Sequence, residues 1–177
     1  FTLMLNETTE AGLSKFFQVD ILHCIALGLL ILFLTRMFIR KRTVFVRALV
    51  FLGLIAVLVA PFVWEVDFDP FLSPFVAAYV NGQHYSQFPV FPWLGFMLFG
   101  GQVGALYLEM KEAEGEGKFG WTVFWWGLVL IALYFLFSLL PSPPFSGLHI
   151  RANPLFFGLR FGIVLLLLVS CWYYAKA

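Results

Sequence analysis

Hydrophobic residues gather along this chain into five long stretches, separated by shorter polar segments. The stretches cover residues 17–39, 43–64, 91–108, 121–140 and 155–174. Each has about the length that a helix rising 1.5 Å per residue needs to cross roughly 30 Å of hydrocarbon. A spanning segment must satisfy its backbone hydrogen bonds internally, and the short alternating segments of a membrane barrel are not seen. We therefore predict an all-α protein, a polytopic bundle of about five transmembrane helices.

The composition supports a membrane protein and excludes little else. Hydrophobic residues make up 62% of the 177 residues and charged residues 12%, about half the charged fraction of a soluble domain. The net charge of +1 gives no reason to expect nucleic acid, so the expected partner is the lipid bilayer. We expect residues 1–177 to form a single transmembrane domain, a fragment of a longer polytopic protein, and homo-oligomer formation stays open.

The distribution of Lys and Arg predicts the orientation of the helices. Eight of these residues fall on one side of the predicted membrane and three on the other. The larger group is expected in the cytoplasm, which puts the N-terminus outside and the C-terminus inside. The eight are Arg36, Arg40, Lys41, Arg42, Arg47, Lys111, Lys118 and Lys176, and the three are Lys15, Arg151 and Arg160.

Two loops on the predicted outer side are longer than ordinary connections. The 65–90 loop is rich in apolar residues, with Ser73 before a proline and Asn81 before a glycine. These residues are typical helix start and stop signals, so we expect a short helix between them. The 141–154 loop carries four prolines and should be stiff and irregular.

Ionisable residues in or beside the spans are the main candidates for chemistry, because burying them is costly. Asp20 and His23 lie three apart near the outer end of the first span, which places them on one helix face. Seven more residues fall on the outer side: His84, His149, Arg151, Arg160, Glu65, Asp67 and Asp69. Together they predict an outer polar basin in which Asp20 pairs with His23 or with an arginine of the fifth span. The alternatives stay open: an interfacial helix cap for Asp20 and His23, snorkelling for Arg160 and an ordinary loop histidine at 84.

The third span contains small residues and one amide. Gly100 and Gly104 form a GxxxG pattern, which favours a close helix contact. Gln102 between them would need a hydrogen-bond partner in lipid, so it should face protein or a cavity. Cys24 and Cys171 lie in apolar stretches without metal-ligand spacing, and no metal site is predicted.

Three segments resemble the catalytic family of heparan-α-glucosaminide N-acetyltransferases, in order and approximate spacing. They are VDILHCIALGLL at 19–30, FPVFPWLGFMLFGGQVG at 88–104 and RANPLFFGLRFGIVLLLL at 151–168. The FPWLG sequence within the second is the most distinctive. The resemblance covers roughly residues 17–175.

The resemblance implies an acyltransferase that passes an acetyl group from acetyl-CoA to a sugar or glycan acceptor on the far side of the membrane, here a bacterial inner membrane. The family's catalytic histidine would lie in a helix N-terminal to this fragment. Asp20 and His23 are then the catalytic candidates within the chain. The candidates for lining the substrate site are Arg151 and Arg160, together with His84 and Gln102 from the residue analysis. A transporter or permease subunit and a non-catalytic membrane scaffold remain the alternatives.

Overall fold

The computed structural model describes residues 19–82, 86–113, 115–142, 144–145, 147 and 149–176, and within these ranges it is built of helices without a strand. In chain order the elements are α3 (Ile21–Phe38), α4 (Arg42–Leu58), α5 (Ala60–Glu65), α6 (Pro74–Val80), α7 (Val90–Glu112), α8 (Glu116–Ser138), the 3₁₀ turn η1 (Ile150–Ala152) and α9 (Pro154–Lys176). The all-α prediction is confirmed.

Five helical segments are long and apolar enough to cross a membrane: α3, α4 with α5, α7, α8 and α9. The predicted limits hold to within a few residues, with two informative differences. The α4–α5 span is broken at Val59, just before Pro61, whose missing N–H removes one helical hydrogen bond. The third span continues to Glu112, because the Glu, Met and Lys residues at 109–112 are good helix formers beyond the apolar stretch. The fourth begins at Glu116.

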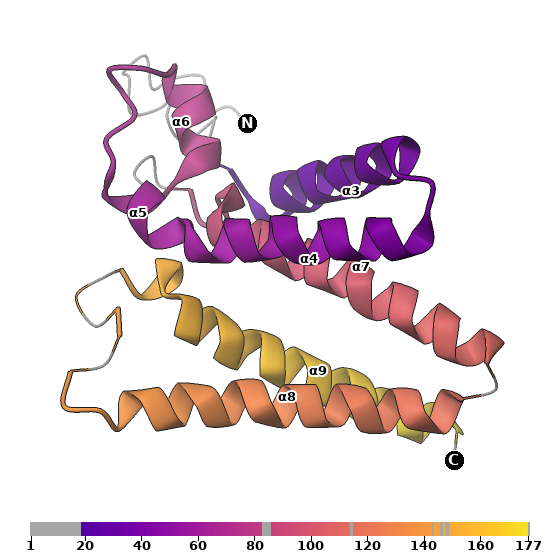
Figure 1. Cartoon of the computed structure of the whole chain (residues 1–177). Coiled ribbons are helices and arrows are strands. Elements are labelled where there is room, and N and C mark those ends of the chain that lie inside the picture. The colour runs from indigo at the N-terminus through magenta and orange to yellow at the C-terminus, as the bar shows by residue number, and fades with distance from the viewer. Residues whose placement is uncertain are drawn as a thin grey trace, which may run out of the picture.

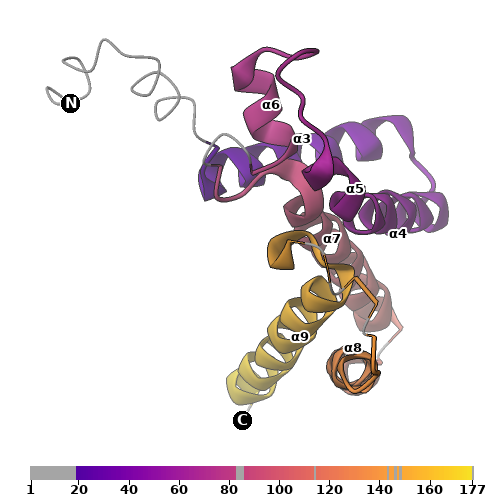
Figure 2. The same cartoon turned by 90° about the vertical axis from the view of Figure 1, so that its left-hand side faces the viewer.

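The five spans pack as two groups. Helix α7 lies against α3 and α4, whereas α8 and α9 form a hairpin that meets the first group along α7 and α4. Figure 2 shows the same division from the side. We call the end of the bundle that carries α6 and η1 the α6 end, and the opposite end, which carries the start of α4, the Arg42 end. Large apolar side chains on all five spans are exposed, which suits a lipid-facing surface.

Close contacts between spans occur at glycines other than those predicted. A Cβ at Gly162 would lie 2.8 Å from the backbone oxygen of Gly127, so the α8 and α9 backbones touch there. On α7, a Cβ at Gly95 would lie 2.8 Å from Val57. The prediction that Gly100 and Gly104 make a close helix contact is wrong, because a Cβ at either position would meet nothing within 4 Å. Gly104 lies nine residues after Gly95, or about two and a half turns, and so on the opposite face of α7.

The short helix predicted in the 65–90 loop is confirmed as α6. It begins after Ser73, has a proline in its first turn and ends at Asn81. The Asn81 side chain is fully buried and donates through Nδ2 to the backbone oxygens of Val63, at 3.3 Å, and Val66, at 3.0 Å. Asn81 therefore ties α6 to the end of α5 and satisfies carbonyls that the end of a helix leaves free.

Candidate functional site

The α6 end gathers aromatic and cationic side chains around the start of α7. The indole Nε1 of Trp64, on α5, donates to the backbone oxygen of Phe91 at 2.8 Å. The Trp64 ring also packs against the His149 ring, with centroids 4.6 Å apart and planes tilted by 34°. His149 Nδ1 accepts from the backbone N–H of Arg151 at 3.3 Å. Trp64 thus connects α5, α7 and the turn η1. Through His149 it also fixes the position of the Arg151 backbone.

Arg160 lies on α9 beside the same cluster. Its guanidinium lies 4.1 Å from the ring centroid of Phe156 and 5.2 Å from that of Trp93. These aromatic faces attract the cation without neutralising its charge. Within the described ranges, no carboxylate forms an ion pair with Arg151 or Arg160. Both arginines therefore remain available to an anionic or strongly polar group.

Trp93 carries the one buried side-chain polar atom without a partner in the described part of the chain. Its Nε1 is inaccessible and donates no hydrogen bond, while its ring packs between Phe88, at 4.9 Å, and Phe96, at 5.7 Å. An unsatisfied buried donor is costly, roughly 1–3 kcal/mol. Trp93 belongs to the FPWLG sequence. The tryptophan of this distinctive sequence is therefore one of the two rings that the Arg160 guanidinium contacts.

Asp20 and His23 form a helix cap. Asp20 Oδ1 accepts from the backbone N–H of Ile21 at 2.7 Å, and His23 Nδ1 accepts from the backbone N–H of Asp20 at 3.4 Å. The Asp20 side chain also accepts from the backbone N–H of His23, so the two residues form a capping box with His23 at the third helical position. Asp20 and His23 therefore pair, each side chain with the backbone of the other, and among the described residues Asp20 forms no ion pair with an arginine. Both side chains are exposed, so the cap leaves them open to a solute.

The remaining candidates lie elsewhere. His84 falls outside the described residues. Gln102 lies midway along α7 and lines a cavity between the two helix groups, as its predicted need for protein or a cavity implies. The structure therefore brings Arg151, Arg160 and His149 together at the α6 end and leaves Gln102 deep in the bundle. In the described ranges no three His, Cys, Asp or Glu residues cluster as metal ligands.

Sequence reasoning missed two residues of this cluster, Trp64 and Trp93, and the contacts of the Asn81 amide with α5. Asn81 was recognised as a helix stop, but a stop signal does not reveal that its amide reaches α5. Trp64 and Trp93 were indistinguishable from interfacial tryptophans. The proline and tryptophan of the FPWLG sequence were the available signal for Trp93.

Fold and composition define an integral membrane protein with five spanning helices. The family model for the catalytic region of heparan-α-glucosaminide N-acetyltransferase matches residues 8–139, which are 132 of the 177 residues. The chain belongs to this family of membrane acetyltransferases. The match includes the 19–30 and 88–104 segments and ends before the 151–168 segment. No curated protein and no solved structure gave a significant match.

Proposed function

We propose that this protein transfers an acetyl group from acetyl-CoA, bound at the Arg42 end, to an amine or hydroxyl of a sugar at the α6 end. The match of 132 residues to the acetyltransferase family carries this proposal. The Lys and Arg bias supports the orientation, with the Arg42 end in the cytoplasm of a bacterial inner membrane and the α6 end outside.

The reaction is acyl transfer. The acceptor nitrogen or oxygen attacks the acetyl carbonyl, a base takes the acceptor's proton, and the thiolate of coenzyme A leaves. Negative charge develops on the carbonyl oxygen, so a nearby cation or hydrogen-bond donor lowers the barrier. We assign Arg151 and Arg160 to the acceptor side, since neither has a carboxylate partner in the described part of the chain. Asp20 and His23 are the catalytic candidates within the chain, with His23 as the base and Asp20 holding it at the start of α3.

The test measures acetyl transfer across the membrane of proteoliposomes. The protein in them is expressed from its native reading frame. Labelled acetyl-CoA is supplied on one side and an amino sugar is trapped on the other. We expect labelled sugar to accumulate on the acceptor side, and Arg160→Gln to reduce it. Glu65→Gln is the control, because it removes one charge from an exposed position at the α6 end that forms no ion pair among the described residues. Folded protein that never consumes acetyl-CoA contradicts the proposal.

A further inference from the structure

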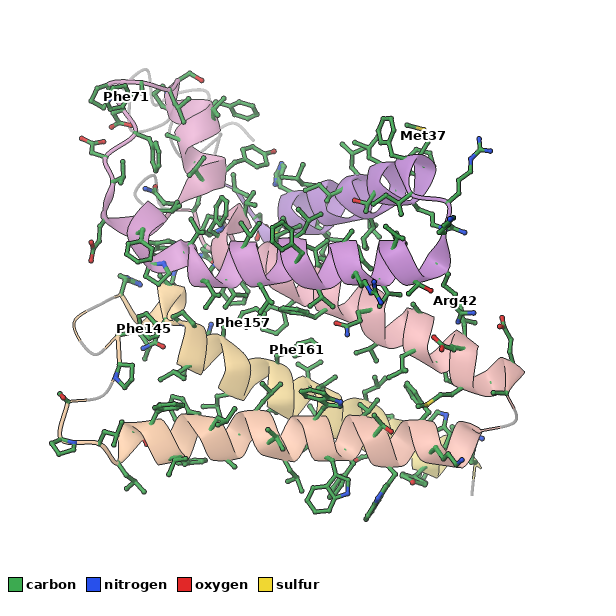
Figure 3. All side chains as sticks on the ribbon, in the orientation of Figure 1. Met37, Arg42, Phe71, Phe145, Phe157 and Phe161 are labelled. Atoms are coloured by element: carbon green, nitrogen blue, oxygen red, sulfur yellow. The ribbon has the colours of Figure 1, made fainter. Side chains whose placement is uncertain are left out.

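A cavity of about 420 Å³ lies between the two helix groups. All four helices around it contribute apolar side chains, among them Leu54 of α4, Phe99 of α7, Trp126 of α8 and Phe161 of α9. Figure 3 shows Phe157 and Phe161 on the side of α9 that faces α4. The volume lies in the range of small-molecule sites, which are mostly apolar with a few polar groups.

Gln102 supplies the amide of this cavity, and every other side chain that lines it is apolar, apart from the indole N–H of Trp126. Among the described residues, no side-chain hydrogen bond is recorded for Gln102. An amide in apolar surroundings gains from a partner, and it offers two donors and an acceptor. The position is 12 residues beyond Val90, about 18 Å along the helix, which is the middle of α7 and deep within the span.

The depth of the Gln102 amide within the span narrows the choice of occupant. The acyl tail of a phospholipid fits the apolar walls. The polar headgroup of that lipid stays at the membrane surface, however, away from Gln102. A molecule that dissolves within the hydrocarbon and carries its own polar oxygen satisfies both the walls and the amide.

We propose that this cavity binds a neutral, membrane-dissolved lipid with a carbonyl or hydroxyl group, which the Gln102 amide holds by a hydrogen bond. An occupant also restores the van der Waals contacts that an empty cavity of this volume forfeits. The site is separate from the cluster around Arg160, and its occupation can be measured without acetyl transfer.

Gly158 gives a direct way to fill the cavity. It lies on the cavity wall, and a Cβ there would have Leu130 as its nearest neighbour, at 3.9 Å. Gly158→Ala therefore adds a methyl group in ordinary contact and leaves most of the space. Gly158→Leu extends a larger side chain from the same point into the cavity. The alanine variant is the matched control for the leucine variant.

The probe is a benzoquinone with a ten-carbon tail, which quenches indole fluorescence, and Trp126 is the reporter. We expect saturable quenching in the purified protein, lost in Trp126→Phe and in Gly158→Leu but kept in Gly158→Ala. Gln102→Leu should weaken binding about five- to tenfold, the loss expected for one hydrogen bond. Unsaturable quenching, or the same affinity in Gly158→Leu, overturns the site. Unchanged affinity in Gln102→Leu overturns the role of the amide. If Gly158→Leu does not fold, the affinity of Gln102→Leu alone tests the proposal.

Discussion

The two ends of the bundle use arginine differently. At the Arg42 end, Arg42 donates to the backbone oxygen of Ala105 at 2.7 Å and forms an ion pair with Glu112 at 3.0 Å. At the α6 end, Arg160 rests on the rings of Phe156 and Trp93 with no carboxylate among the described residues. Figure 3 shows Arg42 close to the end of α7. A cation whose donors are used by protein joins helices, whereas one held by aromatic faces keeps its donors for a ligand.

The largest effect should come from Arg160→Gln. We expect acetyl transfer to fall about a hundredfold, as for loss of a substrate-positioning group, with little change in thermal stability. Arg160→Lys should recover only part of the activity, because a lysine keeps the charge but not the planar fork. Rates in proteoliposomes and melting temperatures in detergent measure the two effects. Full activity in Arg160→Gln would make Arg160 a snorkelling residue only.

Arg42→Gln should show the opposite pattern. The variant loses the bond between α4 and α7, and we expect stability to fall by about 1–2 kcal/mol while transfer per folded molecule is kept. Glu112→Gln removes only the exposed ion pair and should cost less than about 1 kcal/mol. Denaturation of both variants in detergent makes the comparison. Equal losses in the two would show that the ion pair, and not the bond to Ala105, joins the helices.

Two substitutions at Asp20, at the α6 end, distinguish a structural role of this residue from a chemical one. Asp20→Ala removes the cap of α3 and should cost about 1 kcal/mol. Asp20→Asn keeps a capping oxygen without the charge, so stability should return to near that of the unchanged protein. If transfer also returns in Asp20→Asn, the carboxylate acts as a cap alone. A rate that stays low in a stable Asp20→Asn protein assigns the charge a part in the reaction.

The smallest effect is expected at Gly104, on the open face of α7. Gly104→Ala should change stability by less than about 1 kcal/mol, since only helix propensity is altered. Gly162→Ala is the contrasting variant, because its methyl group would meet the backbone of α8, and overpacking of this kind costs about 1–3 kcal/mol. Melting temperatures compare them. A large loss in Gly104→Ala would indicate a helix contact in the membrane that the isolated chain does not show.

The apolar stretches by themselves determined the number of spans, because a segment in lipid must be long, apolar and helical. Local signals also determined α6. Ser73 with Pro74 starts the helix and Asn81 ends it, and each signal acts on the neighbouring turn alone. Which glycines pack was decided by the tertiary structure: Gly95 and Gly104 look alike in sequence, and only the direction of each helix face separates them. The cap of Asp20 with His23 is also local, because it forms within the first turn of α3. The Trp93 ring beside Arg160 and the cavity at Gln102 were decided in three dimensions, because they arise from helices that meet only when the bundle forms.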